Sequence, residues 1–113
     1  MKFSKSLKLN HIFQRLYRTK GFAGGYLVLY ARKNRLGCNR VGITVGKKLG
    51  KAHVRNRVRR RLREAYRIHE TQFRPGWDIV VVARSRAVDA PFAQLTEQYL
   101  SLAQKAGLLA DEP

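Results

Sequence analysis

Apolar residues recur at helical spacing in three separate stretches of the chain. The middle stretch shows the 3.6-residue period most clearly, because its apolar residues fall on one helix face and almost every other position is charged. These apolar residues are Val54, Val58, Leu62, Ala65 and Tyr66. The spacing predicts a short first helix over 9–17, a long helix over 52–68 and a last helix over 89–107.

Alternating and continuous apolar runs predict three strands. Residues 26–32 alternate in a β-favouring stretch and residues 41–46 alternate after a turn, so we expect these two strands to pair antiparallel as a hairpin. Residues 77–84 include the unbroken apolar run 79–83. Such a run is typical of a strand covered on both faces, which predicts a central position in the sheet.

Two features of these elements have more than one explanation: a strand face without large side chains, and an aromatic pair on one face of the first helix. One face of the second strand carries only Gly42, Thr44 and Gly46, so it leaves room for something to approach the sheet closely. The first helix carries Phe13 and Tyr17 four residues apart, which puts both rings on one face. A place in the core is the ordinary explanation for such a pair on one helix, and an exposed stacking surface is the alternative.

The order of the predicted elements is αββαβα. Strands followed by a helix and a further strand indicate an α+β protein, an α/β sandwich with a mixed sheet and helices packed against it. The chain has 113 residues and no internal repeat, so we expect a single domain over 1–113. The tail over 107–113 carries no recognisable motif and is expected to be disordered.

The charge of the chain points to a polyanionic partner. There are 24 Lys and Arg against 7 Asp and Glu, a formal charge of +17, and no acidic residue precedes Glu64. Repulsion on this scale disfavours a compact chain, so we interpret the charge as a surface for a polyanion whose counterions are released on binding. Nucleic acid is the leading candidate. A merely solvated basic surface is the simpler alternative, but such surfaces normally mix both signs.

The long helix concentrates this charge beside its apolar stripe. Planar guanidinium groups on one helix face can hold several phosphates of a folded RNA in register. Like charges at this density would destabilise an isolated helix, which again favours a polyanionic partner. The polar arc next to the stripe consists of Asn56, Arg59, Arg60, Arg63 and Arg67.

The sequence does not indicate catalysis or metal binding by the chain itself. Cys38 is the single cysteine, so no intramolecular disulfide is possible, and the three histidines show no ligand spacing. The residues before Glu64 include no carboxylate for metal binding or acid-base work. No segment approaches the roughly 20 apolar residues that span a bilayer. We therefore expect no catalytic residue and no metal ligand, in a soluble cytoplasmic protein.

These residues resemble one known family, the bacterial ribonuclease P protein. Its hallmark is an Arg-Asn-Arg helix, found here at 55–57, and a Lys-Lys-Leu-Gly like that of 47–50 precedes this helix in the family. The resemblance covers nearly the whole chain, because Phe13 and Tyr17 match an aromatic pair in the family's first helix and Tyr30 matches a tyrosine in its first strand. Two departures are small: Tyr17 stands where phenylalanine is usual, and Gly46 replaces a common serine.

The resemblance implies a fold and a function. The fold would have a left-handed crossover between the second and third main strands, against the general right-handed rule. The function would be that of the non-catalytic subunit of ribonuclease P, an endonuclease that removes the 5′ leader from precursor tRNA. In this family the RNA subunit carries the active site and holds Mg²⁺, and the protein binds both that RNA and precursor tRNA. No obligate protein partner and no membrane partner are implied.

The resemblance also implies two RNA-binding surfaces. One contacts the catalytic RNA, and the other is a cleft between the first helix and the sheet that receives the single-stranded leader. The residues assigned to the catalytic RNA are Arg55, Asn56, Arg57, Arg60 and Arg67. The residues assigned to the leader are Phe13, Tyr17, Tyr30, Thr44, Lys47, Lys48, Arg59 and Arg63.

Two other classes share part of this pattern. A ribosomal protein or RNA chaperone would share the charge, but it need not have a stacking cleft. A membrane-active basic peptide would share the amphipathic helix, but such a helix normally displays bulky apolar residues with no sheet to cover them.

Overall fold

The predicted helices and main strands are present in the computed structural model, which describes residues 4–7 and 10–110. Residue 9, where we expected the first helix to begin, lies outside the described residues. Two very short strands and three short 3-10 helices add to the predicted order. The elements are β1 (Lys5–Ser6), α1 (Asn10–Tyr17), β2 (Phe22–Ala23), β3 (Leu27–Lys33), β4 (Arg40–Thr44), η1 (Lys47–Leu49), α2 (Ala52–His69), η2 (Glu70–Gln72), β5 (Trp77–Ala83), η3 (Ser85–Ala87) and α3 (Phe92–Lys105).

The strands form one mixed sheet in the order β1-β4-β5-β3-β2. The apolar strand β5 is central, as its sequence predicted. It pairs antiparallel with β3 and parallel with β4. The short strands complete the two edges: β1 pairs parallel with β4, and β2 pairs antiparallel with β3.

The predicted hairpin between the first two main strands is wrong. β3 and β4 are consecutive in sequence, but β5 lies between them, so the connection over 34–39 spans the width of one strand. Two strand spacings make about 9.6 Å, a distance that six residues cross easily. The physical reason is that β5 is apolar on both faces from Ile79 to Ala83, so it is most stable in the middle of the sheet with a paired neighbour on each side.

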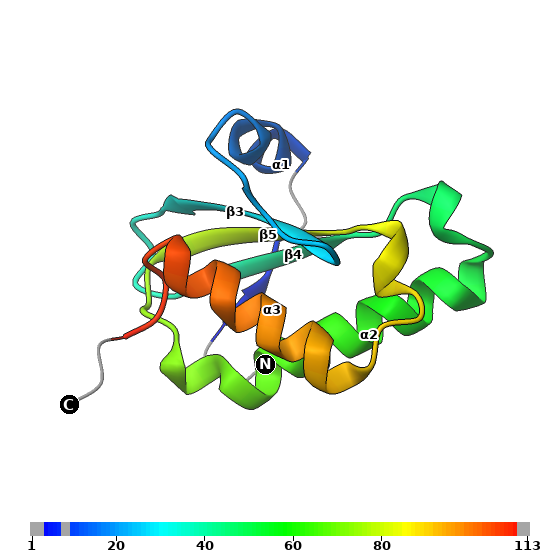
Figure 1. Cartoon of the computed structure of the whole chain (residues 1–113). Coiled ribbons are helices and arrows are strands. Elements are labelled where there is room, and N and C mark those ends of the chain that lie inside the picture. Colours follow the sequence, from blue (N-terminus) through cyan, green and yellow to red (C-terminus); the bar gives the residue numbers. More distant parts are fainter. Residues whose placement is uncertain (1–3, 8–9, 111–113) are drawn as a thin grey trace.

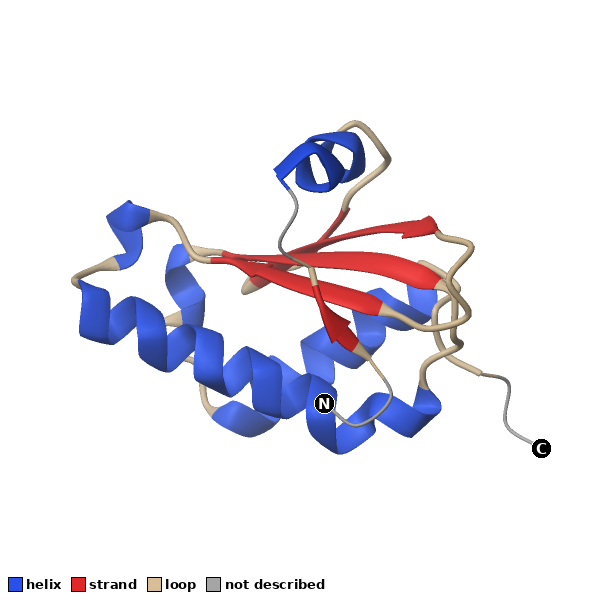
Figure 2. Cartoon of the chain, turned by 180° about the vertical axis from the view of Figure 1, so that it is seen from behind, coloured by secondary structure: helices blue, strands red, loops and turns tan. Residues whose placement is uncertain are grey.

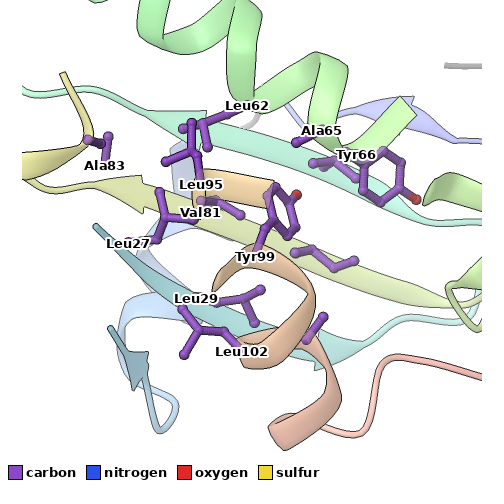
Figure 3. Packing of buried hydrophobic residues seen from close by; sticks show 14 of the residues in the cluster. Leu27, Leu29, Leu62, Ala65, Tyr66, Val81, Ala83, Leu95, Tyr99 and Leu102 are labelled. Atoms are coloured by element: carbon purple, nitrogen blue, oxygen red, sulfur yellow. The ribbon is translucent and has the colours of Figure 1, made fainter. Parts of the chain in front are cut away.

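The helices cover both faces of the sheet (Figures 1 and 2). α2 and α3 lie together on one face, and α1 lies alone on the other. The main core lies between the sheet and the α2–α3 layer, where Leu62, Val81, Leu95 and Tyr99 interlock (Figure 3). The smaller core, beneath α1, consists of Leu7, Leu16 and Val80 with partly buried neighbours.

The apolar stripe predicted for the long helix is confirmed. Val58, Leu62, Ala65 and Tyr66 are all buried, and α2 extends one residue beyond the predicted range. The charged residues between them point away from the core because the helical period separates the two faces.

The segment over 107–110 is not disordered, contrary to expectation. Leu108 is fully buried, and its carbonyl accepts a hydrogen bond from the backbone N–H of Arg74 (2.7 Å). Leu109 forms an isolated antiparallel β-bridge with Phe73. This segment completes the core beside η2. The last part of the expected tail, 111–113, lies outside the described residues.

Two buried tyrosines in the main core differ in how their hydroxyl groups are satisfied. The hydroxyl of Tyr66 lies 2.7 Å from Oγ of Ser4 and accepts a hydrogen bond from Nδ2 of Asn39 (3.2 Å). Asn39 in turn accepts from the backbone N–H of Trp77 (2.8 Å), so the network joins α2 to the starts of three strands. The hydroxyl of Tyr99 has no hydrogen-bond partner among the described residues. Burial raises the pKa of both phenols.

We expect Tyr66→Phe and Tyr99→Phe to have opposite effects on stability. Tyr66→Phe leaves Ser4 and Asn39 without their partner, so unfolding free energy should fall by about 1–2 kcal/mol. Tyr99→Phe removes a buried hydroxyl that makes no hydrogen bond, so stability should be unchanged or higher. Urea denaturation of both variants beside the parent protein measures this. Equal losses in the two variants would contradict the network.

Candidate nucleic-acid interface

The face of the sheet beneath α1 is organised in three rows of side chains. The register of β3, β5 and β4 aligns one residue from each strand, and the pleat puts alternate residues on this face. The rows change in character from apolar to charged along the strands. They are Val28, Val82 and Thr44; then Tyr30, Val80 and Gly42; then Arg32, Asp78 and Arg40.

The bare position at Gly42 is occupied by the first helix. A Cβ atom on Gly42 would lie 2.5 Å from Cζ of Phe13, closer than any real contact, so the ring needs glycine beneath it. The open space that we expected for RNA at this position is therefore filled by Phe13. Gly46 differs, because a Cβ there would have no neighbour within 4 Å.

The three aromatic residues assigned to the leader lie together and form what we call the aromatic cluster: Phe13, Tyr17 and Tyr30. The ring centroids of Phe13 and Tyr17 are 6.4 Å apart, and those of Tyr17 and Tyr30 are 5.3 Å apart with the rings nearly perpendicular. The hydroxyl of Tyr17 lies 2.8 Å from Oγ1 of Thr44 on β4. Four of the residues assigned to the leader thus meet between α1 and the sheet.

The aromatic cluster belongs partly to the core and partly to the surface. Phe13 and Tyr30 are half-buried and pack against the small core under α1. Tyr17 is 37% exposed. The core interpretation is therefore correct for Phe13 and Tyr30, whose rings hold α1 on the sheet. The interpretation as an exposed surface applies to Tyr17, whose ring is open to solvent.

A groove beside β4 adds basic groups to this region. Within the described residues, β1 pairs with β4 at Arg40 and Val41. The groove has a volume of about 210 Å³ and is lined by residues of β4, of α2 and of the segment that contains β1. Arg59 and Arg63 of α2 line it together with Gly42, the glycine beneath Phe13. Gly42 therefore borders both the aromatic cluster and the groove that contains two of the predicted arginines.

Most of the remaining residues of the two predicted surfaces lie in η1 and in the first turns of α2. Lys47 and Lys48 are exposed in η1, immediately before α2. In the first turns of α2, Asn56 and Arg57 are exposed and Arg55 is half-buried. Nε of Arg55 is buried with no hydrogen-bond partner among the described residues.

Several arginines have partners within the protein, and three of them bear on the charge of this region. Arg67 forms an ion pair with Glu64 on the same helix, so its charge is balanced by the protein, unlike that of Arg60. This pairing lowers the pKa of the Glu64 carboxyl and raises that of Arg67. Arg61 donates to the carbonyl of Ala90 and so links α2 to the start of α3. Arg40 pairs with Asp78, described below.

Sequence reasoning missed the last residue of β1 and the residue after it, which both line the groove. Ser6 and Leu7 contribute to it, and Leu7 donates its backbone N–H to Val41 (2.9 Å). A two-residue strand leaves no periodic signal, so only its pairing with β4 identifies it. The described residues contain no group of His, Cys, Asp and Glu that could hold a metal ion, and no helix among them is long and apolar enough to cross a membrane.

Known proteins resemble this chain in both sequence and structure. Residues 1–107 match the family model for Ribonuclease P. The Ribonuclease P protein component of Clostridioides difficile is 42% identical over 107 residues, which cover 93% of this chain and 94% of that protein. The Staphylococcus aureus RNase P protein superposes with a TM-score of 0.84 at 32% identity, covering 93% of this chain and 97% of that one. The RNase P protein from Thermotoga maritima superposes with a TM-score of 0.81 at 31% identity, covering 89% and 96%.

We expect Gly42→Ala to disturb the seat of α1, whereas Gly46→Ala should not. The added methyl at position 42 pushes on Phe13 and should lower stability by about 1–3 kcal/mol. At position 46 the methyl meets nothing and the backbone is extended, so stability should stay level or rise by up to about 1 kcal/mol. Thermal melts compare the two variants. A Gly42→Ala protein as stable as the Gly46→Ala protein would contradict the contact between Phe13 and Gly42.

Proposed function

The chain belongs to the bacterial ribonuclease P protein family, and from this membership we propose how its surfaces divide the work of the enzyme. As a ribonuclease P protein component it is a subunit of an endoribonuclease that matures the 5′ ends of tRNA, and it acts with the ribonuclease P RNA. Our proposal is that α2 binds this RNA and that the aromatic cluster, with the groove beside β4, binds the 5′ leader of precursor tRNA.

The charges of α2 support the first part of the proposal. Asn56, Arg57 and Arg60 are exposed at the side of the helix that does not enter the core. The guanidinium groups of Arg57 and Arg60 have no acidic partner among the described residues, so a phosphate backbone can replace their counterions with a gain in entropy. Arg67 contributes less in our proposal, because Glu64 already balances its charge.

The observation that carries the second part is the exposed ring of Tyr17, which packs against Tyr30 on the face of the sheet beneath α1. Aromatic rings stack on unpaired bases whatever their identity, which suits a protein that handles many leader sequences. Arg59 and Arg63 line the groove that shares Gly42 with the aromatic cluster, and in our proposal they hold the phosphates that follow the stacked bases. Thr44, Lys47 and Lys48 continue this basic and polar surface from the end of β4 into η1.

We also propose that the metal ion of the reaction is held by RNA. Mg²⁺ prefers carboxylate and phosphate oxygens, whereas the aromatic cluster and the groove supply rings and guanidinium groups. The protein's part is then to bind and position the leader. We place this work in the cytoplasm, with no obligate protein partner.

Replacing both Arg55 and Arg57 by Ala should weaken binding to the ribonuclease P RNA. Each lost phosphate contact should also lower the slope of log affinity against log salt by about one. Filter binding across a salt series measures both quantities, with Lys105→Ala on α3 as a control for the loss of an exposed charge elsewhere on the protein. An unchanged slope and affinity in the double variant would exclude this face of α2.

Replacing Tyr30 by Ala should weaken the binding of precursor tRNA and leave the binding of mature tRNA unchanged. One lost base stack corresponds to roughly 1–3 kcal/mol of binding to precursor tRNA in the assembled holoenzyme, and mature tRNA has no leader to lose. Tyr30→Phe should be mild, because the tyrosine hydroxyl makes no hydrogen bond within the described residues. Affinities are measured beside thermal melts, since Tyr30 also packs on the small core. Equal losses for both tRNAs would contradict leader binding.

A further inference from the structure

A second basic groove lies on the same face of the sheet, beyond the aromatic cluster. It separates α1 from the turn between β3 and β4 and has a volume of about 350 Å³. None of the residues that we assigned to RNA lines it. Its charged lining consists of Arg15 of α1, Arg32 and Lys33 of β3, Arg35 of the turn, and the pair formed by Arg40 and Asp78.

The one carboxylate in this groove is already satisfied. Nε and Nη2 of Arg40 donate to the two oxygens of Asp78 at 2.7 and 2.8 Å, and Nδ2 of Asn34 donates to the first of them at 3.0 Å. Both side chains of the pair are largely buried, at 20% and 7% exposure. The pair therefore closes one side of the groove as a neutral, hydrogen-bonded unit.

Three guanidinium groups remain without a balancing charge. Arg15, Arg32 and Arg35 are exposed, and none of them has an acidic partner among the described residues. Arg32 stands beside Asp78 in the sheet register, yet the carboxylate is directed to Arg40. Three like charges around one groove repel one another unless an anion lies between them.

We propose that this groove binds a backbone phosphate of the 5′ leader, upstream of the bases that stack on the aromatic cluster. The inference rests on the proposed function, because it continues the same RNA strand. A phosphodiester group suits the groove because guanidinium groups from three directions can donate hydrogen bonds to its oxygens.

The strand β3 supplies the continuity between the two sites. Tyr30 and Arg32 are two residues apart and project from the same face, which separates their Cα atoms by about 6.6 Å along the strand. A base stacked on Tyr30 therefore brings the adjoining backbone of the leader within reach of Arg32. α1 borders both sites, with Tyr17 toward the aromatic cluster and Arg15 toward the groove.

The test is a series of precursor tRNAs whose leader is shortened one nucleotide at a time, bound to the holoenzyme. With the parent protein, the affinity for precursor tRNA should fall each time the leader loses a nucleotide that the protein contacts. The fall on shortening the longest leaders, which we call the groove step, measures the contact with this groove. Arg32→Gln should remove that step, a loss of roughly two- to fivefold, and lower the salt slope for long leaders by about 0.7. Arg15→Gln, on a different element, should act in the same way.

Control variants separate this groove from general charge. Arg32→Lys keeps a cation and should retain most of the step. Lys105→Gln removes an exposed charge on α3 and should leave the whole series unchanged. Thermal melts should agree among all variants, since the side chain of Arg32 is exposed and makes no hydrogen bond with the described residues.

The outcomes distinguish the groove from the proposed function itself. If Tyr30→Ala abolishes leader dependence while Arg32→Gln keeps every step, leader binding stands and the groove assignment is overturned. If the affinity of the parent holoenzyme for precursor tRNA does not depend on leader length, both the leader-binding proposal and the groove assignment are wrong. If Arg32→Gln weakens mature tRNA or the ribonuclease P RNA alone by the same factor, the phosphate belongs to another RNA segment and the leader assignment is wrong.

Discussion

The rest of the structure depends on burying β5 on both faces and both edges. Ile79 and Val81 point toward α2 and α3, whereas Val80 and Val82 point toward α1. A strand that is apolar on both faces from Ile79 to Ala83 requires a layer on each side and is most stable with a paired neighbour at each edge. This requirement separates β3 from β4, puts α1 alone on its own face and so creates the region between α1 and the sheet where the aromatic cluster lies.

The small core under α1 explains how the aromatic cluster remains partly exposed. α1 has eight residues and only Leu16 is fully buried, so this helix covers the middle of the sheet and leaves its margins open. Phe13 takes its place only because Gly42 has no side chain. A helix held by so few apolar contacts opens at lower cost than the main core, which is a useful property in a surface that must admit RNA.

Charge is used in two ways in this protein. Arg40 and Arg61 are committed to the fold, through Asp78 and through the carbonyl of Ala90. A second group has no acidic partner among the described residues: Arg15, Arg32, Arg35, Arg57 and Arg60. Repulsion among such charges in the isolated protein is relieved when phosphates replace their counterions. The same charges thus lower the stability of the free protein and raise its affinity for RNA, which fits a subunit whose working state includes the ribonuclease P RNA.

The sequence by itself determined the helices, the central strand and the basic face of α2, because each depends on a period that is read along one segment. It also identified the aromatic residues, although their assignment to the leader stays a prediction. Only the tertiary structure decided the strand order, the partner of Gly42, and which arginines are free, since Arg61 looks like its neighbours until Ala90 is placed beside it. Local periodicity specifies which face of an element is apolar, whereas the neighbours of that face come from segments far apart in the chain.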